Sequence, residues 1–417
     1  MKLRIEKAIY GGDGLARVPE GKTVFVPGTL PGELVEATIA SDKRSFATGA
    51  LGDVLEPSAE RVVPGCAYVP RCGGCQYQHA SQAFQLQMKL DILKETLTRA
   101  HLPMPSEIGS LAGPPWGYRN RIRLHVTGAA LGYRQRGSHK LLPISHCPIA
   151  APVLEQAIAA IERVAKETAL ASLCDEVEFF TNGEQDQLLV SLWSEKPRRV
   201  REPSLEAFAE RLQLEIPVLV GVGLGAQSSS IMHWGQRSLT YTLSGVPYQV
   251  SLGSFFQVNR FLLPKLLQLA IGDRSGKLAW DLYSGVGLFA KALAYDNVIA
   301  VESEGFSAND LKTNLDDERH RVIRSGTLDF LRRRVPDHGK PELILVDPPR
   351  AGLGKEVCAL LASVAAPEIV YVSCDPATLA RDLQSLLQSG YSVEKMDLID
   401  LFPQTFHMET VTFLKRN

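Results

Sequence analysis

The C-terminal part of the chain alternates short apolar runs with amphipathic stretches. Apolar runs rich in β-branched residues occupy 278–282, 298–302, 343–346 and 369–372. Continuous runs of this length are typical of parallel strands that are buried on both faces. Residues 251–417 are therefore predicted to form a doubly wound, Rossmann-like α/β domain, whose ligands bind at the carboxyl ends of the strands.

The N-terminal pattern is different, because short alternating runs are separated by turns. Residues 23–26 and 33–39 alternate apolar and polar positions, and Gly and Pro cluster at 11–14 and 27–32. Frequent turns between short strands predict a small β-barrel over residues 1–58. Between the two lies a predicted α+β domain, residues 59–250. A helix predicted at 79–100 is expected to serve packing only, and the C-terminal domain is a candidate neighbour.

Composition narrows the class of protein. Hydrophobic residues make up 45% of the chain and charged residues 22%, as in soluble globular proteins. No apolar run reaches the length of a membrane span, and the first residues lack the apolar segment of a signal peptide, so we expect a cytoplasmic protein with no membrane partner. The seven Cys are an odd number, which argues against a disulfide framework.

A basic stretch points to RNA. The net charge is −1, but residues 61–147 hold eleven Lys or Arg against three Asp or Glu, and no acidic residue occurs between Trp116 and Lys140. In a strand, alternate residues share a face. Basic side chains interleaved with aromatic ones suit phosphate contact and base stacking. The Arg residues expected to contact RNA are Arg119, Arg121, Arg123, Arg134 and Arg136.

Four Cys have the spacing of a metal site. Three of them fall within ten residues as C-x5-C-x2-C, and the fourth lies far downstream. Zinc and iron–sulfur clusters both use four thiolates, and a triplet plus a singlet is more typical of an iron–sulfur cluster. The predicted ligands are Cys66, Cys72, Cys75 and Cys147. Cys174 and Cys358 lie in apolar settings and are predicted to belong to the core.

A Gly-rich turn in the C-terminal domain predicts a nucleotide-like cofactor. The turn at 283–290 follows the strand that ends near Asp281 and is expected to enter a helix. Glu302 ends the next strand 21 residues after Asp281, where an acid typically binds ribose hydroxyls. This pattern fits either NAD or S-adenosylmethionine. The third strand leads into Asp347-Pro348-Pro349-Arg350, a stiff loop suited to holding a planar base and not a feature of dehydrogenases.

Cys374 stands at the carboxyl end of the fourth strand. Asp375 is a favoured N-cap and Pro376 a favoured first helical residue, so Cys374 precedes a predicted helix N-terminus. The helix dipole is expected to lower its pKa below that of a free thiol, as for a nucleophile. The alternative is a buried structural Cys. Glu409, which opens the last strand, would by itself more often be a solvated carboxylate.

Together these motifs resemble the RNA uracil-C5 methyltransferases that make 5-methyluridine. Three match in order, namely Asp347-Pro348-Pro349-Arg350, Ser373-Cys374-Asp375-Pro376 and His407-Met408-Glu409. The start of the chain, Gly11 to Ala16 and Val24 to Gly28, resembles a TRAM domain, an RNA-binding barrel. The four-Cys set is similar to that of the iron–sulfur-containing 23S rRNA members. Leu288 departs from the pattern, since some rRNA members carry a polar residue there.

The resemblance implies roles for individual residues. Cys374 would be the nucleophile and Glu409 the base that removes the C5 proton of uracil. The residues implied to bind S-adenosyl-L-methionine are Gln257, Tyr283, Glu302 and Asp347. It also implies a [4Fe–4S] cluster, an RNA partner and a monomeric enzyme. 23S rRNA is the favoured substrate and tRNA the runner-up. The rivals are an NAD-linked iron–sulfur oxidoreductase, in which Cys374 would have no role, and a non-catalytic RNA-binding protein.

Overall fold

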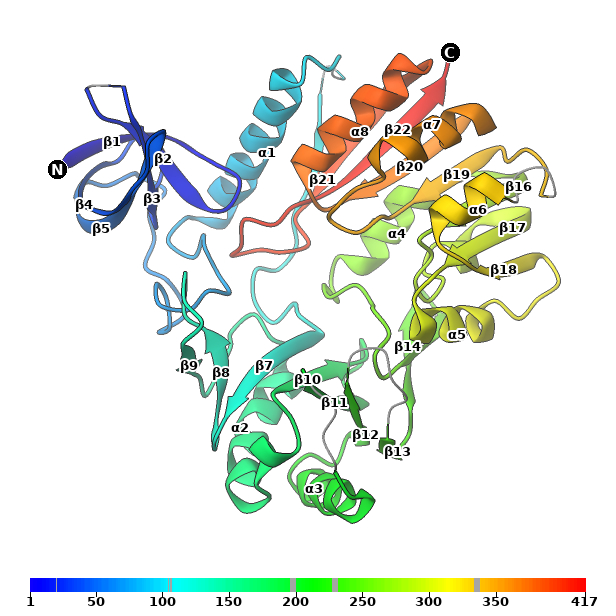
Figure 1. Cartoon of the computed structure of the whole chain (residues 1–417), viewed down its shortest axis with the longest axis horizontal. Coiled ribbons are helices and arrows are strands. Elements are labelled where there is room, and N and C mark those ends of the chain that lie inside the picture. Colours follow the sequence, from blue (N-terminus) through cyan, green and yellow to red (C-terminus); the bar gives the residue numbers. More distant parts are fainter. Residues whose placement is uncertain (20, 104, 106, 196–199, 227–231, 334–337) are drawn as a thin grey trace.

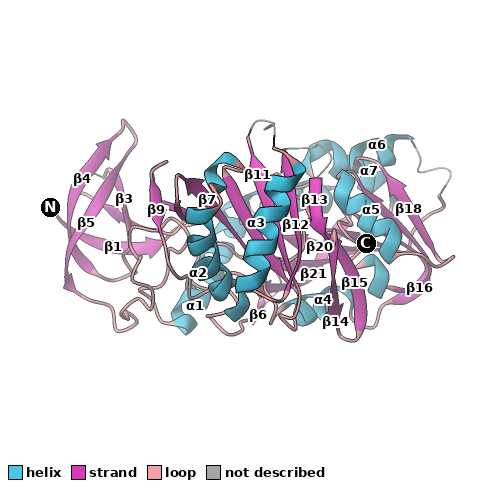
Figure 2. Cartoon of the chain, turned by 90° about the horizontal axis from the view of Figure 1, so that it is seen from below, coloured by secondary structure: helices cyan, strands magenta, loops and turns pink. Residues whose placement is uncertain are grey.

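A computed structural model of the chain describes residues 1–417 except 20, 104, 106, 196–199, 227–231 and 334–337. A closed barrel lies at one end of the molecule, and an eight-stranded sheet with helices lies at the other (Figures 1 and 2). A seven-stranded sheet and a separate hairpin complete the strands of the described residues. Among those residues, no helix is long and apolar enough to cross a membrane.

The N-terminal barrel has the strand order β1-β2-β3-β5-β4, which confirms the predicted small barrel. Buried positions alternate along its strands, with Leu3, Ile5, Val24 and Val26 inside, because successive side chains of a strand point to opposite faces. The strands are β1 (Lys2–Ala8), β2 (Asp13–Arg17), β3 (Thr23–Pro27), β4 (Leu34–Asp42) and β5 (Phe46–Glu56).

The central sheet has the order β13-β12-β11-β10-β7-β8-β9, and two helices share its apolar core. Its strands are β7 (Arg121–Thr127), β8 (Ala130–Arg134), β9 (Leu141–Pro143), β10 (Glu176–Thr181), β11 (Leu188–Ser194), β12 (Leu219–Ala226) and β13 (Met232–Gly235). The helices are α2 (Pro152–Glu167), α3 (Glu202–Glu215) and the short 3-10 helix η1 (Leu170–Ser172). The predicted core residues Cys174 and Cys358 are both buried.

The catalytic sheet, as we name it, has the order β18-β17-β16-β19-β20-β22-β21-β6. The strands from β18 to β20 run parallel, whereas β22 is antiparallel to both β20 and β21. The strands are β6 (Gly109–Leu111), β16 (Ser275–Leu282), β17 (Ala294–Glu302), β18 (His320–Arg324), β19 (Leu343–Val346), β20 (Glu368–Ser373), β21 (Tyr391–Ile399) and β22 (Glu409–Arg416).

Helices cover both faces of the catalytic sheet, so its central strands β19 and β20 are apolar on both faces. In β20, Ile369 and Tyr371 pack into one core, whereas Val370 and Val372 pack into the other. This is the arrangement that the continuous apolar runs predict. The helices are α1 (Gln82–Arg99), α4 (Leu263–Ile271), α5 (Gly305–Asn314), α6 (Thr327–Arg333), α7 (Gly354–Val364) and α8 (Pro376–Gln388), and the hairpin is β14 (Ser238–Leu243) with β15 (Val246–Ser251).

The helix predicted at 79–100 is α1, and it does more than pack. Leu93 and Leu97 share a core with α8, beside which α1 lies in Figure 1. On the same helix Lys89 is fully buried and donates to the Asp400 carboxylate (Nζ–Oδ1 2.6 Å) and to the Phe402 carbonyl (3.0 Å). The expectation that this helix serves packing only is therefore wrong, because α1 also holds the chain between β21 and β22.

The helix expected after the Gly-rich turn is also different. The chain passes from the turn into a short 3-10 helix, η2 (Ala290–Ala292), and then directly into β17. Because β16 ends at 282 and β17 begins at 294, the connection is too short for a full α-helix between parallel strands. The turn is instead fixed by Asp281, whose Oδ2 accepts from the Ala290 N–H (3.0 Å).

Candidate active site and thiol-lined cavity

Cys374 lies where β20 ends and α8 begins, as predicted. Asp375 is the N-cap of α8, and its carboxylate accepts from the N–H groups of Ala377 and Thr378, both at 3.0 Å. Pro376 is the first helical residue, where its missing N–H leaves no donor unpaired. These local preferences place the thiol at the carboxyl edge of the parallel strands, where open α/β sheets bind their ligands.

The expected low pKa of Cys374 is wrong. Burial and the nearby charges of Glu409 and Asp347 raise the pKa of the thiol to about 12, although the Arg350 guanidinium opposes the shift. The helix N-terminus contributes little because Asp375 already occupies its first free N–H groups. In the free protein Cys374 is therefore a neutral thiol at physiological pH.

Two carboxyl groups lie at the same edge, with Glu409 buried and Asp347 partly buried. Asp347 directly follows β19, and burial raises its pKa to about 7. Glu409 opens β22, and burial together with the Asp347 charge raises its pKa well above the usual range. Asp347 Oδ2 accepts from Gln257 Nε2 at 3.4 Å. Glu409 Oε1 has no hydrogen-bond partner within the described part of the chain, which leaves it free to accept a proton.

The four residues implied in cofactor binding surround the turn after β16 and the edge beside it. Tyr283 and Gly285 both have positive φ, at 65° and 55°, and a Cβ added to Gly285 would meet nothing within 4 Å. The open space over Gly285 allows a ligand to approach the backbone. Glu302 accepts from the Gly285 N–H at 2.8 Å. Glu302 Oε1 also accepts from the N–H groups of Ser303 and Glu304, both at 2.7 Å. Since a carboxylate has about four lone-pair sites, about one remains for a ribose hydroxyl.

Leu288, the position that departs from the family pattern, is buried and belongs to the core beneath the turn. Its carbonyl accepts from the Tyr248 hydroxyl at 3.2 Å. An apolar side chain here packs against the hairpin of β14 and β15, so the departure has a structural reason in this chain.

Loop 400–408, between β21 and β22, is held by residues from distant parts of the chain. Its Gln404 has a positive φ of 69°, which is uncommon for a side-chain-bearing residue and is maintained by surrounding contacts. Gln404 and Gln85 exchange two hydrogen bonds, from Gln404 N to Gln85 Oε1 (2.8 Å) and from Gln85 Nε2 to Gln404 Oε1 (3.0 Å). Sequence reasoning missed Gln85 because an amide inside a helical pattern carries no local signal of its partner.

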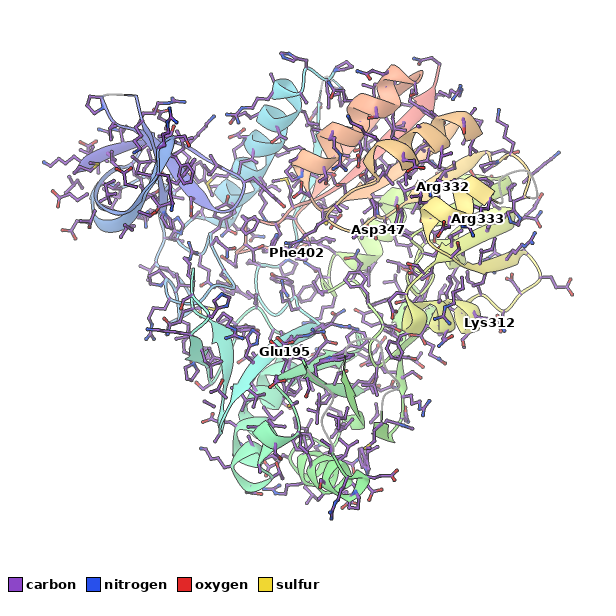
Figure 3. All side chains as sticks on the ribbon, viewed as in Figure 1. Glu195, Lys312, Arg332, Arg333, Asp347 and Phe402 are labelled. Atoms are coloured by element: carbon purple, nitrogen blue, oxygen red, sulfur yellow. The ribbon has the colours of Figure 1, made fainter. Side chains whose placement is uncertain are left out.

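Aromatic rings line the end of this loop. Phe406 lies 4.1 Å from the His407 ring and Phe402 lies 5.8 Å from it, measured between centroids. Burial and the adjacent Arg350 lower the pKa of His407 to about 4, so its ring is neutral. Phe402 and Asp347 lie toward the middle of the molecule, whereas Lys312 and Arg333 lie toward the end farthest from the barrel (Figure 3).

The four predicted metal ligands gather at one cavity. Cys66, Cys72, Cys75 and Cys147 are buried and line a space of about 90 Å³. The Gly74 N–H donates to Cys72 Sγ (3.4 Å), and the Tyr133 hydroxyl donates to Cys147 Sγ (3.6 Å). Among the described residues, however, no group of three or more His, Cys, Asp or Glu side chains is arranged to hold a metal ion.

The lining of this cavity is suited to an anion. It contains Arg119 but no Asp or Glu. Arg119 Nε is buried without a hydrogen-bond partner among the residues that the structure describes. A single zinc ion would need all four sulfurs within ~2.3 Å of one point. An iron–sulfur cube binds each thiolate at a separate iron, so its ligands surround a volume and the group as a whole is anionic.

Two of the five Arg residues expected to contact RNA, Arg121 and Arg123, form ion pairs within the protein. Glu178 pairs with both Arg121 (3.3 Å) and Arg123 (2.8 Å), and Glu176 also pairs with Arg123 (3.4 Å). The acids come from β10, which is the neighbour of β7 in the sheet. Arg136 donates to the Cys75 carbonyl (3.0 Å). The stretch itself lacks acidic residues, but its sequence does not show which acidic residues the adjacent strand places beside it.

Known proteins with similar sequences identify the family of this chain. The chain is 33% identical over 433 residues to the 23S rRNA (uracil(1939)-C(5))-methyltransferase RlmD of Chromohalobacter salexigens, covering 100% of this chain and 89% of that protein. The chain belongs to the RNA (uracil-C5-)-methyltransferase family. The RlmD of Pectobacterium atrosepticum is 32% identical, with 96% of this chain and 90% of that protein covered.

Two segments of the enzyme match family descriptions. Residues 333–417 match the tRNA (Uracil-5-)-methyltransferase family, and residues 1–51 match the TRAM domain. These matches, with the relatives above, confirm the predicted class, an S-adenosylmethionine-dependent RNA methyltransferase with an N-terminal TRAM domain.

A solved structure shares the fold. It is the Pyrococcus abyssi tRNA (uracil-54, C5)-methyltransferase in complex with S-adenosyl-L-homocysteine. The TM-score is 0.78 at 22% identity, with 99% of this chain and 100% of that chain covered. The predicted fold of an S-adenosylmethionine-dependent methyltransferase with an N-terminal barrel is confirmed to this extent.

We predict that Cys374 of the free methyltransferase reacts slowly with iodoacetamide. Because its pKa is raised to about 12, alkylation at pH 7 should be at least roughly tenfold slower than that of an unperturbed thiol of pKa ~8.5. Peptide mass mapping over time measures this rate, and glutathione in the same reaction is the control. Alkylation of Cys374 as fast as that of glutathione would show that the thiol is already activated in the free enzyme.

Proposed function

We propose that this enzyme methylates C5 of a uridine in 23S rRNA through a covalent adduct between Cys374 and uracil C6. The observation that carries the proposal is the placement of Cys374, Glu409 and Asp347 at one edge of the catalytic sheet, where their charges interact. A thiol, a carboxyl group with a high pKa and a second acid are the groups that the chemistry needs.

The first step activates uracil C5, which is a poor nucleophile. Cys374 adds to C6 as a thiolate, and the electrons of the C5–C6 double bond then make C5 nucleophilic. S-adenosylmethionine supplies the electrophilic methyl group and a positive sulfonium charge. A cation held in this site would lower the pKa of nearby acids, so we infer that Cys374 releases its proton to solvent only in the loaded site.

The second step releases the product. After methylation C5 carries both a methyl group and a hydrogen, and the Cys374 sulfur leaves once a base has removed that proton. Glu409 is suited to this role because its buried Oε1 has no partner among the described residues. Its raised pKa keeps it neutral in the free protein, and a bound cation would lower that pKa and leave the carboxylate that accepts the proton. The target base must also leave its stack, which costs roughly a few kcal/mol and least in a loop.

We predict that Cys374→Ala and Glu409→Gln fail at different steps. Cys374→Ala should abolish both methylation and adduct formation, whereas Glu409→Gln should leave methylated RNA attached to Cys374 because the C5 proton stays. Denaturing gel electrophoresis and mass spectrometry measure the adduct, and RNA carrying 5-fluorouridine, which traps the wild-type enzyme, is the positive control. A Cys374→Ala enzyme that still makes 5-methyluridine would contradict the assigned nucleophile.

The choice of 23S rRNA rests on the relatives. Both RlmD proteins that match nearly the whole chain are named for 23S rRNA, whereas the solved structure is named for tRNA. We predict that deletion of this gene removes a 5-methyluridine from 23S rRNA and none from tRNA. Mass mapping of nuclease digests of both RNAs measures the loss, and re-expression of the intact gene is the control. Loss from tRNA alone would move the proposal to the runner-up substrate.

We further propose that the four Cys hold a [4Fe–4S] cluster. The shared cavity, the Gly74 and Tyr133 donors to sulfur, and Arg119 support an anionic group there. In this arrangement Cys66, Cys72, Cys75 and Cys147 would be the ligands, with a structural role, because methyl transfer moves no electron to or from the protein. The domains would be 1–58, 59–250 and 251–417, with α1 and β6 added to the last.

Anaerobically purified enzyme should be brown and contain about four iron and four sulfide per chain. Cys147→Ser should lower both contents, because the cavity then loses one thiolate. Cys174→Ser is the matched control, since Cys174 is buried in the same core but does not line the cavity. Metal analysis and the visible spectrum measure the outcome. Zinc in place of iron, or a colourless protein, would contradict the cluster.

A further inference from the structure

The turn between β1 and β2 connects the barrel to the candidate active site. Tyr10, in this turn, donates from its hydroxyl to the carbonyl of Cys374 at 3.3 Å. The neighbouring Asp375 lies close enough for its charge to raise the pKa of the Tyr10 hydroxyl. A residue of the RNA-binding barrel thus contacts the β20–α8 junction, more than 360 positions later in the chain.

The ring of Tyr10 is held as well as its hydroxyl. It meets Phe406 of loop 400–408 edge to face, with centroids 5.2 Å apart and an interplanar angle of 90°. This is a favourable aromatic geometry. Tyr10 therefore bridges the segment that carries Cys374 and the loop that leads to Glu409.

The turn between β1 and β2 is also packed closely against the segment that follows Cys75. Gly12 has a φ of 95°, and a Cβ at this position would lie 2.7 Å from Gln76 Cβ. A larger residue would therefore displace the barrel or Gln76. Gln76 follows Cys75 directly, and its N–H and that of Tyr77 both donate to the Gln404 carbonyl at 2.9 Å. Three parts of the chain therefore meet here, namely the turn between β1 and β2, the segment that follows Cys75, and loop 400–408.

We propose that Tyr10 is a positioning residue for Cys374, so that the barrel acts on the chemical step as well as on RNA affinity. The inference rests on the proposed role of Cys374 as nucleophile. A hydrogen bond to the Cys374 carbonyl fixes the peptide plane between residues 374 and 375, and with it the direction of the Cys374 side chain. Effective attack on C6 needs that direction to be held, because small misplacements of reacting groups slow a reaction greatly.

The alternative is that Tyr10 only fastens the barrel. The contacts argue for more, since the hydroxyl reaches the Cys374 carbonyl while the ring is already fixed by Phe406. Burial and the adjacent Asp375 raise the pKa of Tyr10, so its hydroxyl remains a neutral donor at physiological pH. Tyr10→Phe removes the donor and keeps the ring, which separates the two roles.

The test measures the rate at which RNA that contains 5-fluorouridine becomes covalently attached to the enzyme. The RNA is a 23S rRNA transcript at saturating concentration under single-turnover conditions, and a tRNA transcript is the second substrate. Tyr10→Phe should lower this rate roughly two- to tenfold, as for loss of one hydrogen bond, and leave the Kd for RNA unchanged. Tyr391→Phe is the matched control. Its buried hydroxyl donates to the Ala366 carbonyl at 2.8 Å, away from the site, so its trapping rate should equal that of wild type.

Two outcomes would overturn the inference. A wild-type trapping rate in Tyr10→Phe, or a change in RNA affinity alone, would show that the hydroxyl does not position Cys374. If Tyr10→Phe is normal and Tyr10→Leu is slow, the ring packing matters and the hydrogen bond does not, which also overturns it. Cys374→Ala is run in parallel. Trapping of that variant would contradict the proposed nucleophile instead, so the two failures are distinguishable.

Discussion

Three acidic groups that lie together at the carboxyl edge of the catalytic sheet, one buried and two partly buried, constrain the rest of the enzyme. Cys374, Asp347 and Glu409 each have a pKa raised by burial, and the neighbouring charges add to the shifts of Cys374 and Glu409. Removal of charged groups from water is unfavourable, so the neutral forms are favoured in the free protein. The site is therefore poised for a cation, and S-adenosylmethionine carries one. The fold places the three acidic groups together, and the positive charge of the cofactor would stabilise their ionised forms.

A buried site of this kind needs a rigid frame, and much of that frame comes from the N-terminal half of the chain. Loop 400–408 is held by Lys89 and Gln85 of α1 and by Gln76 beside the thiol cavity. The Lys89–Asp400 pair is fully buried. Such pairs add little net stability, because desolvation offsets their attraction. We infer that this pair instead fixes one arrangement of the loop, since any other arrangement would leave a buried charge unpaired.

The local parts of this architecture could be predicted from the sequence. The four parallel strands, the Asp375 N-cap and the barrel were predicted because apolar runs, caps and turns are encoded by neighbouring residues. Apart from the helix expected after the Gly-rich turn, the errors concern partners from elsewhere in the chain. Arg121 pairs with Glu178 on another strand, and the Cys374 pKa depends on Asp347 and Glu409. Neither relation can be read from spacing, because each depends on the order of strands in a sheet.

The raised acid pKa values also couple stability to pH in a definite direction. Asp347 has a pKa of about 7 in the folded enzyme and ~3.9 when unfolded. Between these values the folded state binds more protons than the unfolded state, so the free energy of unfolding falls as pH rises from about 4 to 7. A bound cation lowers the folded pKa and removes part of this loss. Cofactor binding therefore releases protons and should strengthen as pH rises through the same range, which makes the loaded site also the more stable one.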